Sequence, residues 1–376
     1  MPFVALTSVA AVWVVEEMAN IGGCEYLTVN FASMLRRAGA DVRIVAPYSA
    51  NPIWTTRLAA AGVEVLLTAR DEPSCQGLCR VARATCLSRP PDLIQFLPTG
   101  ESLRQWCAEP VPGVPVVGLE ATSLGAGNYW LSQDLPLLLR QLDALIVLTD
   151  AAASEARDRL GYSGPLYVVP HTVPPPTAAI EPWRSRPAVV SCIGRLSLEK
   201  GAEIAVLALA HLRDRVPDVE LHVWGDGEDK QRLQDLAAMM GIADRVRLRG
   251  LFAPMVGVDD VARSSTMMLL ASYLEGMPGA LMEMAVRGIP IVATRTAGAA
   301  AVVGEDYPWL ARIGDPADLA RCMEHLLTDD AAYEQARSRV AARFSQRYHP
   351  DIALQRLLDC YHAIVGRGAP ALGRGL

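Results

Sequence analysis

Short apolar segments alternate with helical patterns along this chain, and this alternation most constrains what the chain can fold into. The apolar segments are continuous runs, which is typical of strands buried on both faces of a sheet. Strands that alternate with helices predict parallel sheets joined by helical crossovers. In the first half of the chain we expect strands at residues 3–8, 42–47, 63–68, 93–97, 114–119, 144–149 and 166–170. In the second half we expect strands at residues 188–194, 220–224, 246–249, 267–272 and 290–294.

Helical patterns fill the intervals between these strands. The clearest of them cover residues 25–37, 151–160, 202–213, 229–240, 280–287 and 316–327. A last segment, residues 350–364, carries apolar side chains at helical spacing. We expect this helix to pack back on the first half of the chain.

The alternation stops at residues 171–187, which read HTVPPPTAAIEPWRSRP and contain five prolines. Proline runs continue neither a helix nor a central strand, so this segment predicts a linker. A length of 376 residues also favours two domains over one. We therefore expect Rossmann-like, doubly wound α/β domains at residues 1–172 and 188–345, with a linker at 173–187 and a returning segment at 346–376. Ligands of such sheets bind at the carboxyl ends of the strands, which predicts that the two domains face a cleft.

Composition excludes some classes of function. A net charge of −6 and a pI of about 5.6 argue against nucleic acid as the main partner. None of the eight cysteines forms a CxxC pair, and the first 170 residues contain no histidine, so neither a disulfide framework nor a metal site is expected. The apolar N-terminus lacks a preceding basic region, and no apolar run has the length of a membrane span. We expect a cytoplasmic protein with reduced thiols and no stable membrane insertion.

Residues 194–201, GRLSLEKG, follow an expected strand and begin an expected helix. Arg195 and Lys200 place two cations beside glycine-rich backbone at a helix start, which suits a diphosphate. A solvated loop with an Arg195–Glu199 ion pair is the alternative. Lysine is otherwise nearly absent, since Lys230 is the only other one in the chain.

Residues 272–283, SYLEGMPGALME, place Glu275 in a glycine- and proline-rich loop and Glu283 in the following helix. Backbone amides of such a loop and a carboxylate beside them can hydrogen-bond the hydroxyls of a sugar or a ribose. A helix-dipole role would account for Glu283 but not for Glu275. Two further turns, at residues 224–228 and 294–298, lie at strand ends. The first contains a Gly-x-Gly, which lets a ligand approach the backbone. Taken alone, each turn is only weak evidence for a binding site.

Taken together, these segments resemble the retaining GT-B glycosyltransferases of the glycogen-synthase-like and sucrose-synthase-like group (family 4 type). Glu275 and Glu283 have the spacing of that family's E-x7-E motif, and GRLSLEKG and the Gly225–Asp226–Gly227 turn also match it. The N-terminal GGCE at residues 22–25 matches the family's G-G-x-E loop. The motifs occur in order over nearly the whole chain.

The resemblance implies a metal-independent transfer from a UDP-, GDP- or dTDP-sugar, with the donor as a substrate and no cofactor. No D-x-D metal clamp is present in the sequence. Arg195, Lys200 and Glu275 would be catalytic, and Glu283 would hold the ribose hydroxyls. The donor site implied by the resemblance also contains Gly22, Gly23, Gly194, Arg249, Gly250, Gly276, Met277, Pro278 and Gly279. The amides of Gly276, Met277 and Gly279 would lie near the hydroxyls of the donor sugar.

The acceptor is less well specified by the sequence. Many family members have a histidine after the fifth strand, where this chain has Glu120. Glu120 is therefore a candidate contact for an amino or otherwise modified sugar or for the acceptor. The alternative is that its carboxylate caps the end of the strand. Residues 9–19 and 121–130 are the expected acceptor loops, with Trp13 and Tyr129 as candidates to stack on a ring, although packing of the cleft rim is the alternative. We expect a small-molecule acceptor, with a natural product, an aminocyclitol or a sugar as the candidates.

Four other functions remain as alternatives. They are a transferase acting on a lipid or polysaccharide, a GT-B nucleotide-sugar epimerase, an NAD-dependent oxidoreductase and an inactive GT-B-like binding subunit. The missing histidines disfavour the epimerase, and the missing third glycine of the dinucleotide fingerprint disfavours the oxidoreductase. The complete set of Arg195, Lys200, Glu275 and Glu283 disfavours the inactive subunit.

Overall fold

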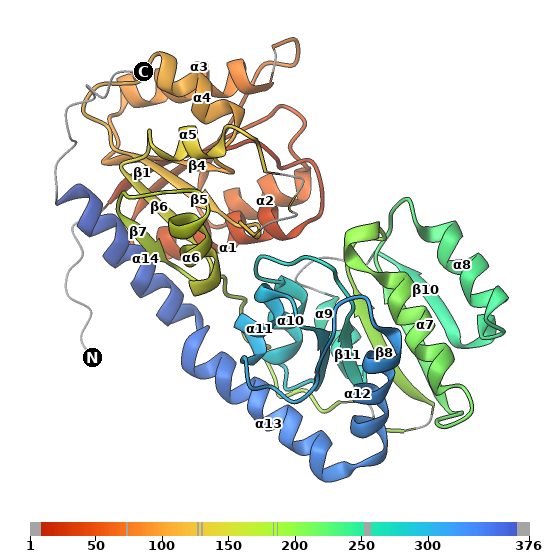
Figure 1. Cartoon of the computed structure of the whole chain (residues 1–376). Helices are drawn as coiled ribbons and strands as arrows, with labels where there is room; N and C mark the ends of the chain where they lie inside the picture. Colours follow the sequence, from red (N-terminus) through yellow and green to blue (C-terminus); the bar gives the residue numbers. More distant parts are fainter. Residues whose placement is uncertain are drawn as a thin grey trace. The chain divides into compact units, whose positions relative to one another are not determined.

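The computed structural model of the chain describes residues 9–72, 74–125, 128, 131–182, 184–185, 187–251 and 257–366. The chain divides into two compact units (Figure 1). Unit 1 comprises residues 1–171 and 351–376, and unit 2 comprises residues 172–350. Each unit is a parallel sheet with helical crossovers, so the predicted α/β fold of two Rossmann-like domains is confirmed.

The sheet of unit 1 has seven parallel strands in the order β3-β2-β1-β4-β5-β6-β7. The order runs outward from the centre in both directions, which is the doubly wound pattern. The strands are β1 (Ala10–Val15), β2 (Asp41–Ala46), β3 (Glu64–Leu67), β4 (Leu93–Leu97), β5 (Val116–Glu120), β6 (Ala144–Val147) and β7 (Leu166–Val168).

Helices cover the strands of unit 1, and successive side chains of each strand point to opposite faces. One face carries Val12, Val14, Ile94 and Phe96, which pack in one core with α3, α4 and α5, including Trp106. The other face meets α14, because Tyr361 on that helix bonds to Gln95 on β4. The helices are α1 (Gly23–Arg37), α2 (Pro52–Ala60), α3 (Ser74–Ser88), α4 (Glu101–Ala108), α5 (Leu135–Leu139), α6 (Asp150–Asp158) and α14 (Pro350–Val365).

The first strand differs from the prediction. The strand expected at residues 3–8 lies outside the described residues, whereas β1 at Ala10–Val15 occupies the sheet centre between β2 and β4. The assignment of residues 9–19 to an acceptor loop is therefore wrong for its first part. Alanine has a weak strand preference, but a central strand is selected by burial on both faces, and every residue from Ala11 to Val15 is buried.

The sheet of unit 2 has six parallel strands in the order β10-β9-β8-β11-β12-β13. These are β8 (Ala188–Ile193), β9 (Val219–Trp224), β10 (Val246–Gly250), β11 (Met267–Leu270), β12 (Ile291–Thr294) and β13 (Leu310–Ala311). The first five agree with the predicted ranges to within one or two residues. The two-residue β13 was not predicted, since a strand that short carries no periodicity.

The helices of unit 2 pack along both sides of its sheet, with α7 beside α12 and α13 beside α10 and α11 (Figure 1). Helix α7 is apolar nearly all round, as expected of a helix buried between the sheet and its neighbours. The helices are η1 (Leu198–Lys200), α7 (Ala202–Leu212), α8 (Lys230–Met239), η2 (Ala243–Arg245), α9 (Val258–Arg263), α10 (Gly279–Ala285), α11 (Ala297–Val303), α12 (Pro316–Thr328) and α13 (Asp330–Arg347).

The loops that follow β8, β9, β11 and β12 all emerge at one edge of the unit 2 sheet, because parallel strands end on the same side. The loops after β8 and β11, together with helix α10, contain every residue that the sequence assigned to the donor in this half, except those at the end of β10. The fold thus brings residues more than a hundred positions apart to one edge.

The packing of α14 on unit 1 can be tested at Tyr361. This side chain is fully buried, and its hydroxyl donates to Gln95 Oε1 at 2.8 Å. We expect Tyr361→Phe to lower the free energy of unfolding by about 1–3 kcal/mol, because the Gln95 oxygen loses its partner in the core. Urea denaturation measures this change. Tyr48→Phe, which alters an exposed ring, is the control; equal stability of both variants would contradict the described packing.

Candidate functional site

The segment after β8 turns sharply before α7, and Gly201 makes the turn possible. Gly201 has φ of +61°, in the left-handed region that favours glycine, and α7 begins at the next residue. A Cβ at this position would lie 2.2 Å from the carbonyl oxygen of Ala271. The backbone at Gly201 therefore lies directly against the end of β11, and it places Lys200 beside the loop that carries Glu275.

The fold requires glycine at both Gly225 and Gly227 in the turn after β9, for a reason that the sequence did not reveal. A Cβ at Gly225 would lie 1.8 Å from the carbonyl oxygen of Gly194, and one at Gly227 would lie 2.4 Å from that of Leu196. Leu196 also donates its amide to Asp226 O at 3.0 Å. What approaches this turn closely is the neighbouring loop of the chain itself, which is thereby fixed in place.

Glu275 is the centre of a polar cluster at the end of β11. It is buried, with 8% of its surface exposed. Its Oε1 accepts hydrogen bonds from Lys200 Nζ at 2.8 Å and from Ser272 Oγ at 2.7 Å. Thr294 Oγ1 in turn donates to Ser272 O at 2.6 Å. Two of the three predicted catalytic residues are thus in direct contact although 75 positions separate them in the sequence.

The backbone of the Glu275 loop packs directly against the start of α11. A Cβ at Gly298 would lie 2.7 Å from Glu275 O and 2.6 Å from Gly276 O, so only glycine allows this close approach. Thr296 caps the helix through its side chain, which accepts the amide of Ala299. The segment at residues 294–298, uninformative in the sequence, holds the loop.

Arg195 and Glu283 lie at either end of this arrangement. Arg195 follows Gly194 directly, is about half exposed and lies 3.4 Å from Glu199 Oε1. This is the ion pair that the alternative interpretation required, and it leaves part of the guanidinium at the surface. Glu283 lies on α10, which starts after Pro278 at Gly279, with Met277 at the loop side. The carboxylate of Glu283 is partly exposed.

Arg249 and Gly250, at the end of β10, belong to the same edge. The guanidinium of Arg249 lies over the ring of Trp224 at 5.9 Å. Gly250 has φ of +71°, and its carbonyl accepts the amide of Gly225 at 2.9 Å. This bond connects the end of β10 to the glycine turn after β9.

Unit 1 presents a second glycine loop at the start of α1. Gly22 precedes the helix, and a Cβ there would lie 2.7 Å from Glu25 Oε2, whereas a Cβ at Gly23 would meet nothing within 4 Å. The space beside Gly23 is open, so another molecule can approach the backbone there. At Gly22 the nearest atom belongs to the flexible end of the Glu25 side chain, which can move aside.

Glu120 lies at the end of β5 and is buried, with 3% of its surface exposed. Its Oε1 accepts the amide of Thr99 at 2.8 Å, in the loop after β4. Glu16, after β1, accepts the amide of Ser102 in the first turn of α4 at 2.6 Å. Desolvation raises the pKa of Glu120 to about 8, and it also raises the pKa of Glu16. The strand-end capping interpretation of Glu120 thus has a direct structural basis.

The two aromatic candidates for acceptor stacking have different outcomes. Trp13 is fully buried in the middle of β1, so the prediction that it stacks on an acceptor is wrong. Its continuous apolar surroundings in the sequence are the signal that indicated a core position. Tyr129 lies outside the described residues, as do residues 126, 127, 130 and 183. Its predicted contact with the acceptor therefore stays a prediction.

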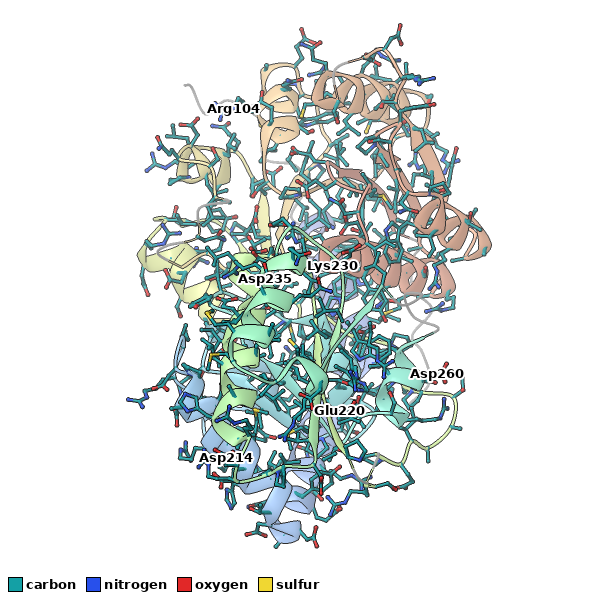
Figure 2. The ribbon with its side chains drawn as sticks, turned by 90° about the vertical axis from the view of Figure 1, so that its right-hand side faces the viewer. Arg104, Asp214, Glu220, Lys230, Asp235 and Asp260 are labelled. Carbon is teal, nitrogen blue, oxygen red and sulfur yellow. The ribbon has the colours of Figure 1, made fainter. Side chains whose placement is uncertain are left out.

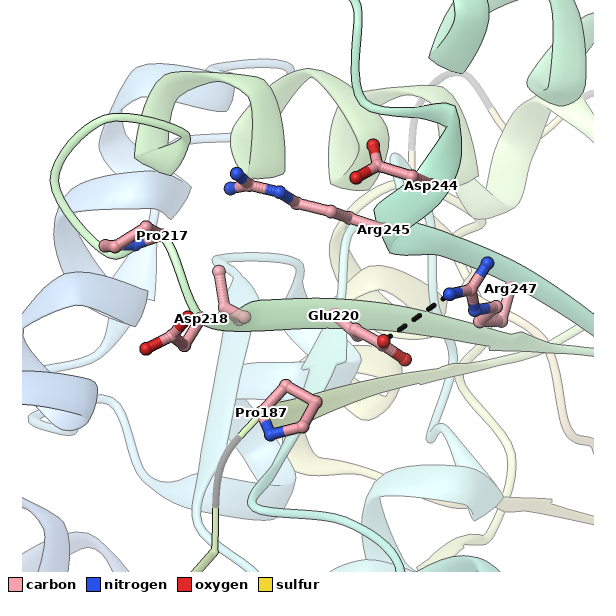
Figure 3. A pocket seen from close by; sticks show the side chains of 8 residues that line it. Pro187, Pro217, Asp218, Glu220, Asp244, Arg245 and Arg247 are labelled. Atoms are coloured by element: carbon pink, nitrogen blue, oxygen red, sulfur yellow. Dashed lines mark ion pairs between the residues drawn. The ribbon is translucent and has the colours of Figure 1, made fainter.

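The cavity shown in Figure 3 lies at the opposite edge of the unit 2 sheet, where β8, β9 and β10 begin. Its volume is about 590 Å³, and its lining includes Pro187, Asp218, Glu220 and Arg247. Arg247 and Glu220 form an ion pair across it at 3.5 Å. None of the predicted donor residues lines this cavity.

The part of the chain that the structure describes was also compared with the requirements of a membrane span and of a metal site, and it meets neither. No helix there is long and apolar enough to cross a membrane. No group of three or more His, Cys, Asp or Glu side chains in this part of the chain could hold a metal ion. All eight cysteines are free thiols.

Comparison with known proteins shows what this fold and sequence are similar to. Residues 177–343 match the family described as "Glycosyl transferases group 1". The whole fold is similar to solved GT-B glycosyltransferases: HepE of Anabaena in complex with UDP and glucose (TM-score 0.75, 18% identity, 94% of this chain and 99% of that one) and sucrose-phosphate synthase of Thermosynechococcus elongatus (TM-score 0.78, 15% identity, 96% and 100%). The chain therefore has the GT-B fold, and residues 177–343 are similar in sequence to group 1 glycosyl transferases.

Curated relatives are similar over part of their length. The chain is 30% identical over 207 residues to 2-deoxystreptamine glucosyltransferase of Streptomyces kanamyceticus, which covers 51% of this chain and 53% of that protein. It is 35% identical over 192 residues to D-inositol 3-phosphate glycosyltransferase of Corynebacterium jeikeium, with coverages of 47% and 44%. The chain thus spans about half the length of the curated relatives it matches.

The state of Glu120 predicts a pH dependence of stability. The unfolded side chain loses its proton near its ordinary pKa of 4.5, whereas the folded one keeps it until about pH 8. Between these values only the folded state holds the proton, so the free energy of unfolding falls as the pH rises from about 5 to 8. We expect Glu120→Gln to flatten this slope in urea denaturation series. The exposed control Glu109→Gln should retain it; an unchanged slope in Glu120→Gln would contradict the assignment.

Proposed function

We propose that this chain is a retaining glycosyltransferase that moves a sugar from a nucleoside-diphosphate sugar to a hydroxyl of a small-molecule acceptor. One observation carries the proposal: Lys200 and Glu275, from separate loops, meet at 2.8 Å at the carboxyl edge of the unit 2 sheet. Arg195 lies on the same loop as Lys200. A bound diphosphate carries negative charge that must be neutralised. The side chains of Arg195 and Lys200 supply two positive charges for this.

The donor is held, in this proposal, by groups of the loops after β8 and β11 and of helix α10. Arg195 and Lys200 bind the diphosphate, and Glu283 accepts hydrogen bonds from the ribose hydroxyls. Glu275, with the amides of Gly276, Met277 and Gly279, faces the donor sugar. Structures similar in fold carry UDP or UDP-glucose, which supports a nucleoside-diphosphate donor, and UDP, GDP and dTDP are the candidates.

The transfer step follows from the charges. The bond between the anomeric carbon and the diphosphate oxygen breaks, and its electron pair leaves with the diphosphate. Arg195 and Lys200 neutralise this growing charge, which is the main lowering of the barrier. The acceptor oxygen attacks from the same face, and its proton passes to the departing diphosphate oxygen, so the configuration is retained and no metal enters the step.

We infer an acceptor of the cyclitol class, aminocyclitol or inositol-like. Relatives named for 2-deoxystreptamine and D-inositol 3-phosphate support this class. Free thiols throughout the chain support a cytoplasmic location.

A donor and acceptor panel read by mass spectrometry tests this proposal. UDP-, GDP- and dTDP-sugars are each combined with an aminocyclitol, an inositol and a lipid-linked sugar. A product with retained configuration on a cyclitol is expected. Transfer only to the lipid-linked sugar would replace the cyclitol by a lipid as the acceptor class. An isomerised donor without transfer would indicate an epimerase. The absence of any product, together with no thermal stabilisation by any nucleotide, would refute the proposal.

Lys200 gives the sharpest substitution. We expect Lys200→Ala to lower kcat about 100- to 1000-fold, as for the loss of one group that stabilises a departing charge. Lys230→Ala is a matched control, because Lys230 is the only other lysine and lies exposed at the start of α8 (Figure 2). Steady-state kinetics on the best donor measures both. Equal losses in the two variants, or no loss in Lys200→Ala, would contradict the role of Lys200.

A further inference from the structure

Tyr273 lies in the loop after β11 and contacts the loop after β8, and the sequence motifs assign it no role. Its amide donates to Glu199 O at 2.9 Å, which joins the loop after β11 to the loop after β8. Its ring covers the turn at Gly201, since a Cβ there would lie 3.5 Å from the ring, and on another side it reaches Gly314, where a Cβ would lie 3.4 Å away. The side chain is partly exposed, at 37%.

The hydroxyl of Tyr273 continues this connection to α7. It donates to Glu203 Oε1 at 3.1 Å, and Glu203 is buried, with 8% of its surface exposed. The other oxygen of Glu203 lies 3.6 Å from the guanidinium of Arg232 on α8. Arg232 is itself fixed by two hydrogen bonds of 2.9 Å to Asp229. Burial and the Glu203 charge raise the pKa of Tyr273, so its hydroxyl keeps the proton that it donates.

We propose that Tyr273 and Glu203 form a brace that positions Lys200 against Glu275 for transfer. Lys200 lies immediately before the turn that the Tyr273 ring covers, and Glu203 lies two residues after that turn. Glu275 follows Tyr273 by two residues in the same loop. The brace therefore fixes the backbone on both sides of the Lys200–Glu275 contact without itself touching the pair. Tyr273 and Glu203 are positioning residues of the reaction, and this role rests on the proposed function.

The ion pair between Lys200 and Glu275 needs such support to keep a fixed geometry. Lysine has a long, flexible stem, so a lone contact to a carboxylate leaves its ammonium free to reorient. A small misplacement of a group that stabilises departing charge lowers the rate more than it lowers affinity. Because the brace acts through the backbone of Lys200, its loss should appear in kcat and much less in the KM for the donor.

Kinetics of a small variant set tests the brace. We expect Tyr273→Phe to lower kcat about tenfold and to change the donor KM less than about twofold, since one hydrogen bond to a charged group is lost. Glu203→Ala should have a similar effect, whereas Glu203→Gln, which keeps an oxygen acceptor, should retain most of the activity. The double variant Tyr273→Phe/Glu203→Ala should be no slower than either single variant, because both remove the same bond. Tyr48→Phe, an exposed tyrosine of unit 1, is the control.

A second readout needs no turnover. The chain has only two lysines, so ¹³C-dimethylation of the amines gives separate NMR signals for Lys200, Lys230 and the N-terminal amine. We expect the Lys200 signal to move in Tyr273→Phe and to stay in Tyr48→Phe, with the Lys230 signal constant in both. This comparison distinguishes failure of the brace from failure of the proposed function: an inactive wild type refutes the function, while the Lys200 signal still reports on the brace. An unmoved Lys200 signal, a kcat of Tyr273→Phe equal to wild type, or effects that multiply in the double variant would overturn the brace.

Discussion

The contact between Lys200 and Glu275 is the interaction on which the rest of the proposed donor site depends. A partly buried ion pair adds little to stability, because desolvation offsets most of the attraction between the charges. Its presence at a sheet edge, with a second bond from Ser272, is better explained by function. The pair holds a cation and a carboxylate at a fixed spacing before any ligand arrives, and such preorganisation is how a protein lowers the cost of stabilising a departing charge.

Close backbone contacts make that spacing possible. The loop after β8 is held by the Gly225 turn on one side and by the end of β11 at Gly201 on the other, and the Glu275 loop rests on Gly298. In all three places a side chain would collide with a carbonyl oxygen. Gly201, Gly225 and Gly298 are therefore needed because segments of the chain lie against each other, whereas the space beside Gly23 in unit 1 is open and leaves room for another molecule.

The sequence predicted much of this arrangement, and the reasons for its failures are physical. Continuous apolar runs identified nearly all strands, and motif spacing selected Lys200 and Glu275. The central strand β1 was missed because two apolar runs adjoin there, and Trp13 was placed at the surface for that reason. Tyr273, Glu203 and Gly298 carry no local signal, since their roles arise from contacts between segments that are distant along the chain. Glu120 could be recognised as unusual, but only the structure shows that it binds the amide of Thr99.

A crystal structure with the nucleoside diphosphate that stabilises the chain most would test the central claim most directly. The account predicts that the diphosphate lies within hydrogen-bonding distance of Arg195 and Lys200, with the ribose hydroxyls at Glu283 and the space beyond the phosphate next to Glu275. A nucleotide bound elsewhere, or one bound at this edge without contact to Lys200, would contradict it.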